Sequence, residues 1–166
     1  MFFVRTAMKK DVPRVREILA DGWRDTYIAI YGEERVEEII EDWHSIERLE
    51  ARLSLPNSEF LVADNGQVVG GVAFATPLDK EIMLHQLYVH PDFQGGKTGL
   101  HLMIEIENSF MDAEKISLEV EPANEKAIRF YEKYGFKTVG KTENCGQAES
   151  GIEALIMEKQ IAYAED

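Results

Sequence analysis

Cysteine is almost absent from this sequence, which has only Cys145 among its 166 residues. One cysteine cannot form an intrachain disulfide, and we interpret this one as a bystander rather than a nucleophile. Histidine is also scarce, and its positions lack the spacing of metal ligands: His44, His85, His90 and His101. We therefore expect neither a disulfide framework nor a bound metal.

Long apolar runs are absent as well. No stretch approaches the about 20 apolar residues that a membrane helix needs. The first residues, Met1-Phe2-Phe3-Val4-Arg5, lack the basic segment and long apolar core of a signal peptide. These absences predict a cytoplasmic protein with no membrane partner. The length suits one ordinary core, so we expect a single domain over residues 1–166.

Basic residues are few, with 18 Lys and Arg against 31 Asp and Glu, for a net charge of −13. This balance argues against a nucleic-acid partner, because phosphate neutralisation needs clustered bases. The imbalance is uneven: residues 97–141 carry 8 acids and 7 bases, whereas residues 1–96 carry 17 and 10. The nearly neutral segment can receive an anion. The acidic remainder either favours a cationic substrate or only keeps the chain in solution.

A glycine-rich turn stands between an apolar run and a helical pattern, over Leu87-Tyr88-Val89-His90-Pro91-Asp92-Phe93-Gln94-Gly95-Gly96-Lys97-Thr98-Gly99. The helix that follows has one apolar face, formed by Gly99, Leu102, Met103, Ile106 and Phe110. A strand that runs through glycines into a helix leaves backbone N–H groups pointing one way, at the positive end of the helix dipole. Such a turn binds phosphate.

One interpretation of this turn is a nucleotide-binding P-loop, whose last residues would be Gly96-Lys97-Thr98. The full P-loop pattern needs a glycine at the position of Pro91. It also needs an aspartate for magnesium at the end of a later strand, and the strand at 116–120 offers only Glu119. The P-loop interpretation therefore lacks its first turn and its metal ligand.

A second interpretation comes from two motifs. Gln94-Gly95-Gly96-Lys97-Thr98-Gly99 resembles the [RQ]-x-x-G-x-[GA] pyrophosphate loop of the GNAT superfamily of acyl-CoA-dependent N-acyltransferases, with Lys97 in place of the middle glycine. The segment from Asn124 to Phe136 resembles the family's N-x-x-A-x-x-[FL]-Y-x-x-x-G-F motif throughout. The resemblance implies the GNAT fold: an α/β mixed sheet of about seven strands with four helices on both faces, in the order β-α-α-β-β-β-α-β-α-β-β.

The resemblance also implies an acetyl-CoA-dependent N-acetyltransferase. Such an enzyme acetylates a primary amine of a small molecule, such as a polyamine or amino acid, or of a peptide or protein, by direct attack in a ternary complex. The resemblance also implies which residues bind the cofactor. They are the backbone of Leu87, Tyr88 and Val89, the loop residues Gln94, Gly95, Gly96, Lys97, Thr98 and Gly99, and Asn124, Ala127 and Phe130. Asn124 also suits a helix N-cap. The alternative function is a non-catalytic acyl-CoA-binding module.

The proton transfers need an acid and a base. We expect Tyr131 to protonate the leaving thiolate, because a phenol and a thiol have similar pKa values; the alternative is a packing role. The family's usual base position is Met83, which cannot take a proton. Glu81 and His85 would share its strand face and are candidate bases. A water chain is the third option.

Recognition of the amine is expected near the N-terminus, where Trp23, Tyr27 and Tyr31 are close to several acids. These rings could hold an alkyl ammonium by cation–π contacts, or they could be helix-packing core.

Periodicity and turn residues predict the other elements. Asp11 is expected to cap the first helix, an aromatic-rich connection to follow Trp23, and Asn65-Gly66 to close a hairpin. The expected segments are strands at 2–6, 60–63, 68–75, 81–89, 115–120, 136–143 and 152–159, helices at 33–42, 46–53 and 125–134, and a mobile loop at 142–151. Exposed sheet edges would allow a homodimer.

Overall fold

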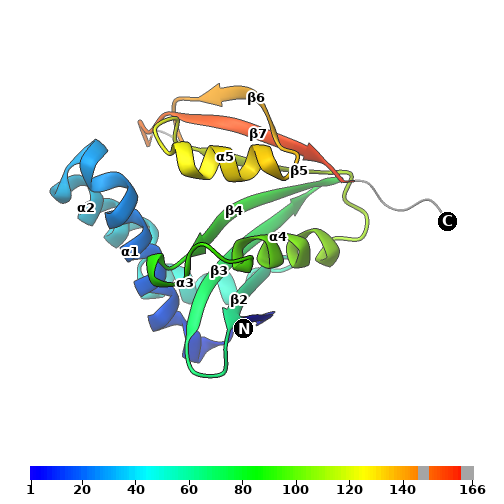
Figure 1. The fold of residues 1–166 in the computed structure, drawn as a ribbon, viewed down its shortest axis with the longest axis horizontal. Helices are drawn as coiled ribbons and strands as arrows, with labels where there is room; N and C mark the ends of the chain where they lie inside the picture. Colours follow the sequence, from blue (N-terminus) through cyan, green and yellow to red (C-terminus); the bar gives the residue numbers. More distant parts are fainter. Residues whose placement is uncertain (146–149, 162–166) are drawn as a thin grey trace. The chain divides into compact units, whose positions relative to one another are not determined.

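The computed structural model describes residues 1–145 and 150–161. Seven strands form one mixed sheet in the order β1-β2-β3-β4-β5-β7-β6 (Figure 1). The elements are β1 (Phe3–Thr6), a 3₁₀ turn (Lys9–Asp11), α1 (Val12–Tyr31), α2 (Glu33–Trp43), α3 (Ile46–Leu53), β2 (Glu59–Asp64), β3 (Val69–Leu78), β4 (Glu81–Val89), a second 3₁₀ turn (Pro91–Phe93), α4 (Thr98–Ser109), β5 (Lys115–Val120), α5 (Glu125–Lys133), β6 (Lys137–Thr142) and β7 (Ala154–Gln160). The predicted mixed sheet and element order are confirmed, with the segment 46–53 forming a helix of its own.

The chain divides into two compact units. One contains Met1–Ala75 and Gln86–Ser109, and the other contains Thr76–His85 and Phe110–Asp166. The boundaries between the units fall inside β3 and β4, so each of these two strands has residues in both units. The single domain expected over residues 1–166 stays a prediction.

The core of the first unit lies between α1, α3 and the strands β2 and β3. Its buried side chains follow the helical spacing expected for α1 and the alternation expected for strands: Val12, Val15, Ile18, Leu19, Leu49, Phe60, Val62, Val72 and Phe74. Burial of this apolar surface is the main force that stabilises the unit. Next to this core, α2 packs on α1 through its buried Val36, Ile39 and Ile40 (Figure 1).

The start of α1 corrects one expectation. Asp11 stands at the N-cap position, but its side chain makes no cap hydrogen bond. Its carboxylate instead accepts bonds from the Arg5 guanidinium at 2.8 and 2.9 Å and from the Met8 N–H at 2.8 Å. Arg5 also binds Asp64 at 3.0 Å, so it joins β1 both to β2 and to the start of α1. The bond from Arg5 is the main reason that the pKa of Asp11 lies below its usual range.

The aromatic-rich connection expected after Trp23 is wrong, because α1 continues through Tyr31. No proline interrupts this stretch, and the helix ends at Gly32, which has a positive φ of 84°. Gly22 lies inside the helix, where a Cβ would stand 3.0 Å from the Tyr88 ring. A glycine at this position permits α1 to lie close to β4.

The Asn65-Gly66 connection does join two antiparallel strands, as predicted, but its mechanism differs. Of these two residues only Gly66 has a positive φ, at 89°. The Asn65 side chain accepts the N–H groups of Gln67 and Val68 at 2.9 and 2.8 Å. The turn is thus a longer loop that an asparagine side chain closes.

The second unit is built on β5, β7 and β6. β5 pairs in parallel with β4 from Glu81↔Lys115 to Leu84↔Leu118, and it pairs antiparallel with β7. α5 ends before Gly135, whose φ of 98° fits the predicted helix stop. Of the loop expected at 142–151, residues 146–149 lie outside the described residues. No helix in the described part of the chain is long and apolar enough to cross a membrane.

Candidate functional site

The turn between β4 and α4 is anchored to β3 and to the end of β4. At its start, the His90 N–H donates to the Gly70 carbonyl at 2.8 Å. Further along, the Gln94 amide donates to the Val89 carbonyl at 2.9 Å, and Gly95 adopts a φ of 96°. α4 then begins at Thr98. We call residues 90–97 the β4–α4 loop.

The surface of this loop suits an anion. The first turn of a helix has N–H groups without helical partners, and the helix dipole adds positive potential there. Gly95 and Gly96 are exposed, and a Cβ at either position would meet nothing within 4 Å. The Lys97 side chain is exposed as well. The loop therefore leaves room for a phosphate to reach its backbone, which is what the pyrophosphate of CoA requires.

The strand β4 leads into this loop with the alternation predicted for it. Ile82, Leu84 and Gln86 are buried, whereas Met83 is half-buried and His85 is exposed. The ladder to β5 covers Glu81 to Leu84. The expected cofactor-binding residues Leu87, Tyr88 and Val89, all half-buried, lie beyond the last pair of that ladder.

The two candidate bases have different surroundings. The Glu81 carboxylate accepts a hydrogen bond from the Ser117 hydroxyl and lies 3.7 Å from the Lys115 ammonium. His85 is exposed, and its Nε2 lies 2.7 Å from the Thr76 hydroxyl. The Met83 sulfur lies 3.1 Å from the Ser117 hydroxyl. Glu81 is therefore held by a structural cluster, whereas His85 faces the surface.

The second sequence motif forms α5 and its flanks. The Asn124 side chain accepts the Ala127 N–H at 3.2 Å, so this residue does cap the helix. Tyr131 is buried, with ring centroids 5.4 Å from both Phe130 and Phe136. α5 also carries three exposed basic side chains: Lys126, Arg129 and Lys133.

The predicted acceptor aromatics form a row on α1. Trp23 and Tyr27 are only 6% and 5% exposed, with ring centroids 4.3 Å apart. Trp23 also packs on Trp43 of α2 at 5.5 Å, and Tyr31 is half-buried at the end of the row. The burial of Trp23 and Tyr27 favours a packing role for these two rings.

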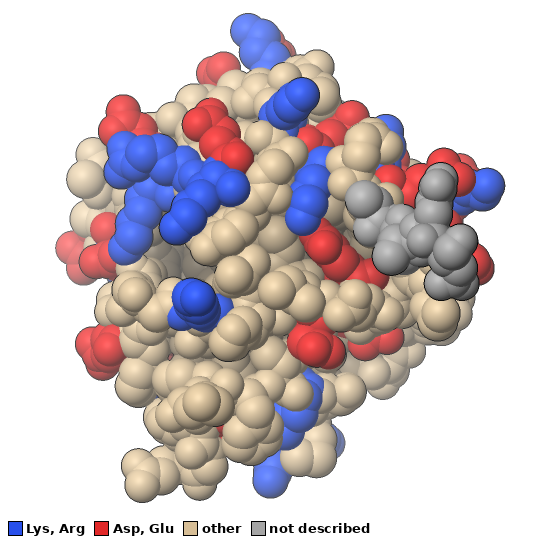
Figure 2. Space-filling model, turned by 45° about the vertical axis from the view of Figure 1, so that its right-hand side comes forward, with Lys and Arg blue, Asp and Glu red and all other residues tan. Residues whose placement is uncertain are grey.

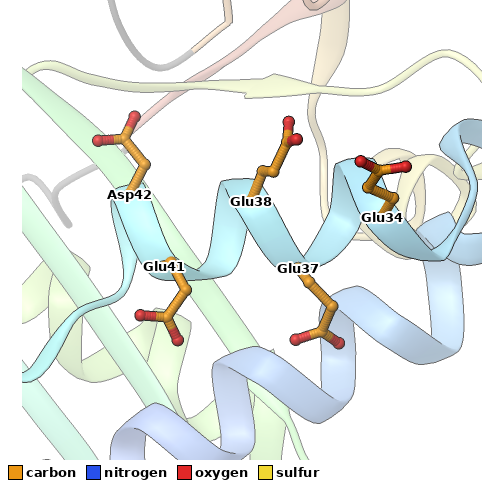
Figure 3. A pocket seen from close by; sticks show the side chains of 5 residues that line it. All are labelled: Glu34, Glu37, Glu38, Glu41 and Asp42. Carbon is orange, nitrogen blue, oxygen red and sulfur yellow. The ribbon is translucent and has the colours of Figure 1, made fainter.

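An acidic pocket on α2 extends what the sequence indicated. Its lining consists of five carboxylates: Glu34, Glu37, Glu38, Glu41 and Asp42. Figure 3 shows Glu37 and Glu41 on the side of α1 and the other three on the opposite side. We call Glu34, Glu38 and Asp42 the acidic row. Sequence reasoning recognised an acidic helix but missed this division, although the row's i, i+4, i+8 spacing was its signal.

Ion pairs explain the division. The Arg24 guanidinium binds Glu37 at 2.6 and 3.0 Å and lowers its pKa, and Arg16 binds Glu41. These two acids thus connect α2 to α1. Among the described residues, exposed ion pairs join Glu38 to Arg35 at 3.5 Å and Asp42 to Arg48 at 3.4 Å. Exposed pairs of this kind contribute little free energy and exchange readily.

Charge is mixed on other parts of the surface. Figure 2 shows a face on which basic and acidic side chains both occur among uncharged ones. The net charge of −13 therefore does not make that face uniformly acidic.

Cys145 is half-buried, and burial raises the pKa of its thiol to about 12. A thiol in this state is a poor nucleophile, in keeping with a bystander role.

Comparison with known proteins gives the family. The family model described as Acetyltransferase (GNAT) family matches residues 13–136. A spermidine N(1)-acetyltransferase of Thermoplasma acidophilum is 28% identical over 141 residues, which cover 81% of this chain and 87% of that protein.

Solved structures agree with this match. The PaiA N-acetyltransferase of Thermoplasma acidophilum, in complex with coenzyme A, has a TM-score of 0.85 at 26% identity, over 97% of this chain and 99% of that one. The ribosomal-protein-S18-alanine N-acetyltransferase of Escherichia coli shares the fold, with a TM-score of 0.73 at 18% identity over 100% and 97% of the two chains. The family match excludes the P-loop interpretation. The chain belongs to the GNAT family of acetyltransferases, enzymes that take their acetyl group from acetyl-CoA.

Proposed function

We propose that this acetyltransferase modifies a primary amine of a polyamine-like cation by direct attack in a ternary complex. The acidic row on α2 is the observation that carries the proposal. Carboxylates at i, i+4 and i+8 repeat along a helix at intervals of about 6 Å. A polyamine presents ammonium groups that are separated by short methylene chains, so it matches such a row in both charge and spacing. The similarity to a spermidine N(1)-acetyltransferase supports the same acceptor class.

The β4–α4 loop is the proposed seat of the cofactor. Gln94 and Gly99 match the family's loop, and the open space above Gly95 and Gly96 supports pyrophosphate binding by backbone N–H groups. The pantetheine arm would follow the backbone of Leu87–Val89. When bound, acetyl-CoA supplies an activated thioester.

Acetyl transfer then requires two proton movements. The amine lone pair attacks the acetyl carbonyl carbon, the carbon–sulfur bond breaks, and the thiolate leaves. We assign Tyr131 to donate the proton that the thiolate takes, because the family resemblance of the second motif implies this role and the pKa values of a phenol and a thiol are similar. Its burial supports the assignment, since it limits the access of water. The amine proton leaves through a base.

His85 is the better supported candidate for that base. It lies on the same strand face as Met83, where the family has a glutamate, and it is exposed. Glu81 is the second candidate, but Ser117 and Lys115 already hold its carboxylate. His85 also has a hydrogen-bond partner, the Thr76 hydroxyl, but its ring is exposed, so water reaches it more readily than it reaches the half-buried Glu81.

The proposal is tested by thiol release with acetyl-CoA and three acceptors: spermidine, lysine and a peptide with a free N-terminus. We expect spermidine to be the best acceptor. Tyr131→Phe should lower kcat by about 100-fold without changing the KM for spermidine, because general-acid catalysis is worth about 10²–10⁴. The double variant Glu34→Gln with Glu38→Gln should raise the KM for spermidine about tenfold at unchanged kcat, which is about 1.4 kcal/mol.

A matched control is Glu47→Gln, an exposed acid on α3 outside the pocket, which should leave the KM unchanged. Release with the peptide but not with spermidine would contradict the polyamine acceptor. An unchanged KM in the double variant would contradict the role of the acidic row.

A further inference from the structure

His90 joins the start of the β4–α4 loop to the middle of α1. It is the first residue after β4 and is only 8% exposed. Its ring Nε2 lies 2.9 Å from a carboxylate oxygen of Asp21. Its ring Nδ1 accepts the Asp92 N–H at 3.2 Å. Both ring nitrogens are therefore engaged, one with a helix and one with the loop.

The two hydrogen bonds define the tautomer of this ring. Because Nδ1 accepts a bond from a backbone N–H, its lone pair is occupied, and the proton stands on Nε2. Nε2 then donates to the Asp21 carboxylate, a charge-assisted bond. The only other charged side chain that binds Asp21 in the described residues is Arg24, at 3.3 Å on the same helix.

Packing fixes the ring on its other sides. The Phe93 ring lies 6.2 Å from the His90 ring and 5.2 Å from the Phe2 ring. One residue beyond Asp21, Gly22 lets the Tyr88 ring approach α1 closely. The end of β4 is thus held against α1 at two successive helix positions, and the following turn inherits that placement.

We propose that His90 and Asp21 are positioning residues for acetyl-CoA, which hold the β4–α4 loop in its pyrophosphate-binding form before the cofactor arrives. The inference rests on the cofactor seat given under the proposed function. A loop that is already ordered avoids the entropy cost of ordering on binding. Loss of the Asp21–His90 bond should therefore weaken cofactor binding and leave the chemical step unchanged.

Four variants separate the two bonds of His90. His90→Asn can still accept the Asp92 N–H but is too short to reach Asp21, whereas His90→Gln can reach Asp21 with an amide N–H. Asp21→Ala removes the partner, and Asp21→Asn keeps a carbonyl oxygen that can accept the Nε2 proton. Glu17→Gln, at an exposed acid four residues earlier on α1, is the matched control.

The readouts are the calorimetric Kd for CoA and the KM and kcat for acetyl-CoA at saturating spermidine. His90→Asn and Asp21→Ala should raise both Kd and KM about tenfold, with kcat within about twofold. Asp21→Asn and His90→Gln should recover most of the affinity. The combination of His90→Asn with Asp21→Ala should be no weaker than either alone, because both remove the same bond.

Gly96→Asp tests the cofactor seat by itself, because it places a negative charge in open space without straining the backbone. If Gly96→Asp leaves the Kd for CoA unchanged, the proposed seat is wrong and the inference fails with it. If Gly96→Asp weakens binding but His90→Asn and Asp21→Ala do not, the seat stands and the positioning role is overturned. A fall in kcat in step with a loss of folded protein, at unchanged KM, would likewise overturn it.

Discussion

His44 is a buried imidazole at the end of α2, and neither of its ring nitrogens has a hydrogen-bond partner among the residues that the structure describes. Trp23 and Trp43 pack near it, with ring centroids 6.1 and 6.5 Å away. Burial, with a further contribution from the Arg52 charge, lowers the pKa of His44 to about 3. The ring therefore stays neutral in the folded protein at pH values where it would be charged in the unfolded chain.

This difference predicts a pH-dependent loss of stability. Below pH about 6.5 the unfolded chain binds a proton at His44 that the folded protein does not, so the stability present above that pH is lost as the pH falls toward 3. By pH 5 the loss is about 2 kcal/mol. His44→Phe removes this contribution. Denaturant unfolding at several pH values should show that, between pH about 6.5 and pH 5, the free energy of unfolding falls by about 2 kcal/mol less in the variant than in the wild type. Parallel stability curves for the two proteins would contradict the assignment.

Arg52 is a half-buried charge that sequence reasoning did not single out. Its guanidinium donates to the Gln86 side chain at 2.9 Å and to the Trp43 carbonyl at 2.8 Å, and it lies over the Phe74 ring. Burial lowers its pKa to about 10, which still leaves it protonated near neutral pH. Its partners come from β4, α2 and β3, so only the folded chain reveals this role.

The helix α5 depends on the cap that Asn124 provides. Asn124→Ala removes the bond to the Ala127 N–H and should cost about 1 kcal/mol of unfolding free energy, whereas Asn124→Asp keeps a capping oxygen and should cost little. If Asn124 also holds the cofactor arm, both variants should raise the KM for acetyl-CoA, because neither retains the amide N–H. Thermal unfolding and steady-state kinetics on the two variants separate these roles. Equal stability of the two variants would refute the cap.

Elements were predictable where local signals acted alone. The bounds of β4 and β5 match the expected 81–89 and 115–120, because alternation and flanking turns are properties of the sequence itself. α1 was expected to end too early because aromatic residues suggested a connection, whereas Tyr27 is buried beside Trp23 on a helix that continues to Tyr31. Asp11 was expected to be a cap, but its carboxylate binds the Arg5 guanidinium instead. Arg5 belongs to another element, so no local pattern predicts this bond. Tertiary partners overrode local preference in both cases.

The charge of the whole molecule predicts how salt affects the reaction. With a net charge of −13, the protein attracts a polyvalent cation over distances comparable with the Debye length of about 8–10 Å. Added salt should therefore raise the KM for spermidine several-fold between about 0.05 and 0.3 M, and it should raise the KM for a monoamine much less. Steady-state assays over this range test the expectation. A KM for spermidine that does not depend on salt would contradict electrostatic recognition.

The candidate site could be predicted only in part. Two motifs indicated the family and a cofactor loop, because backbone recognition depends on glycines at fixed positions. The division of the acids on α2 and the Asp21–His90 bond could not be predicted. Asp21 and His90 are 69 residues apart in sequence, and no local pattern connects them.

Lys97 stands where the family's loop has its middle glycine, and its side chain lies exposed while the neighbouring glycines keep the backbone open. Recognition by main-chain groups does not depend on a side chain that points away from them. This position therefore tolerates a side chain, and a pattern search that demanded glycine there would overlook this chain.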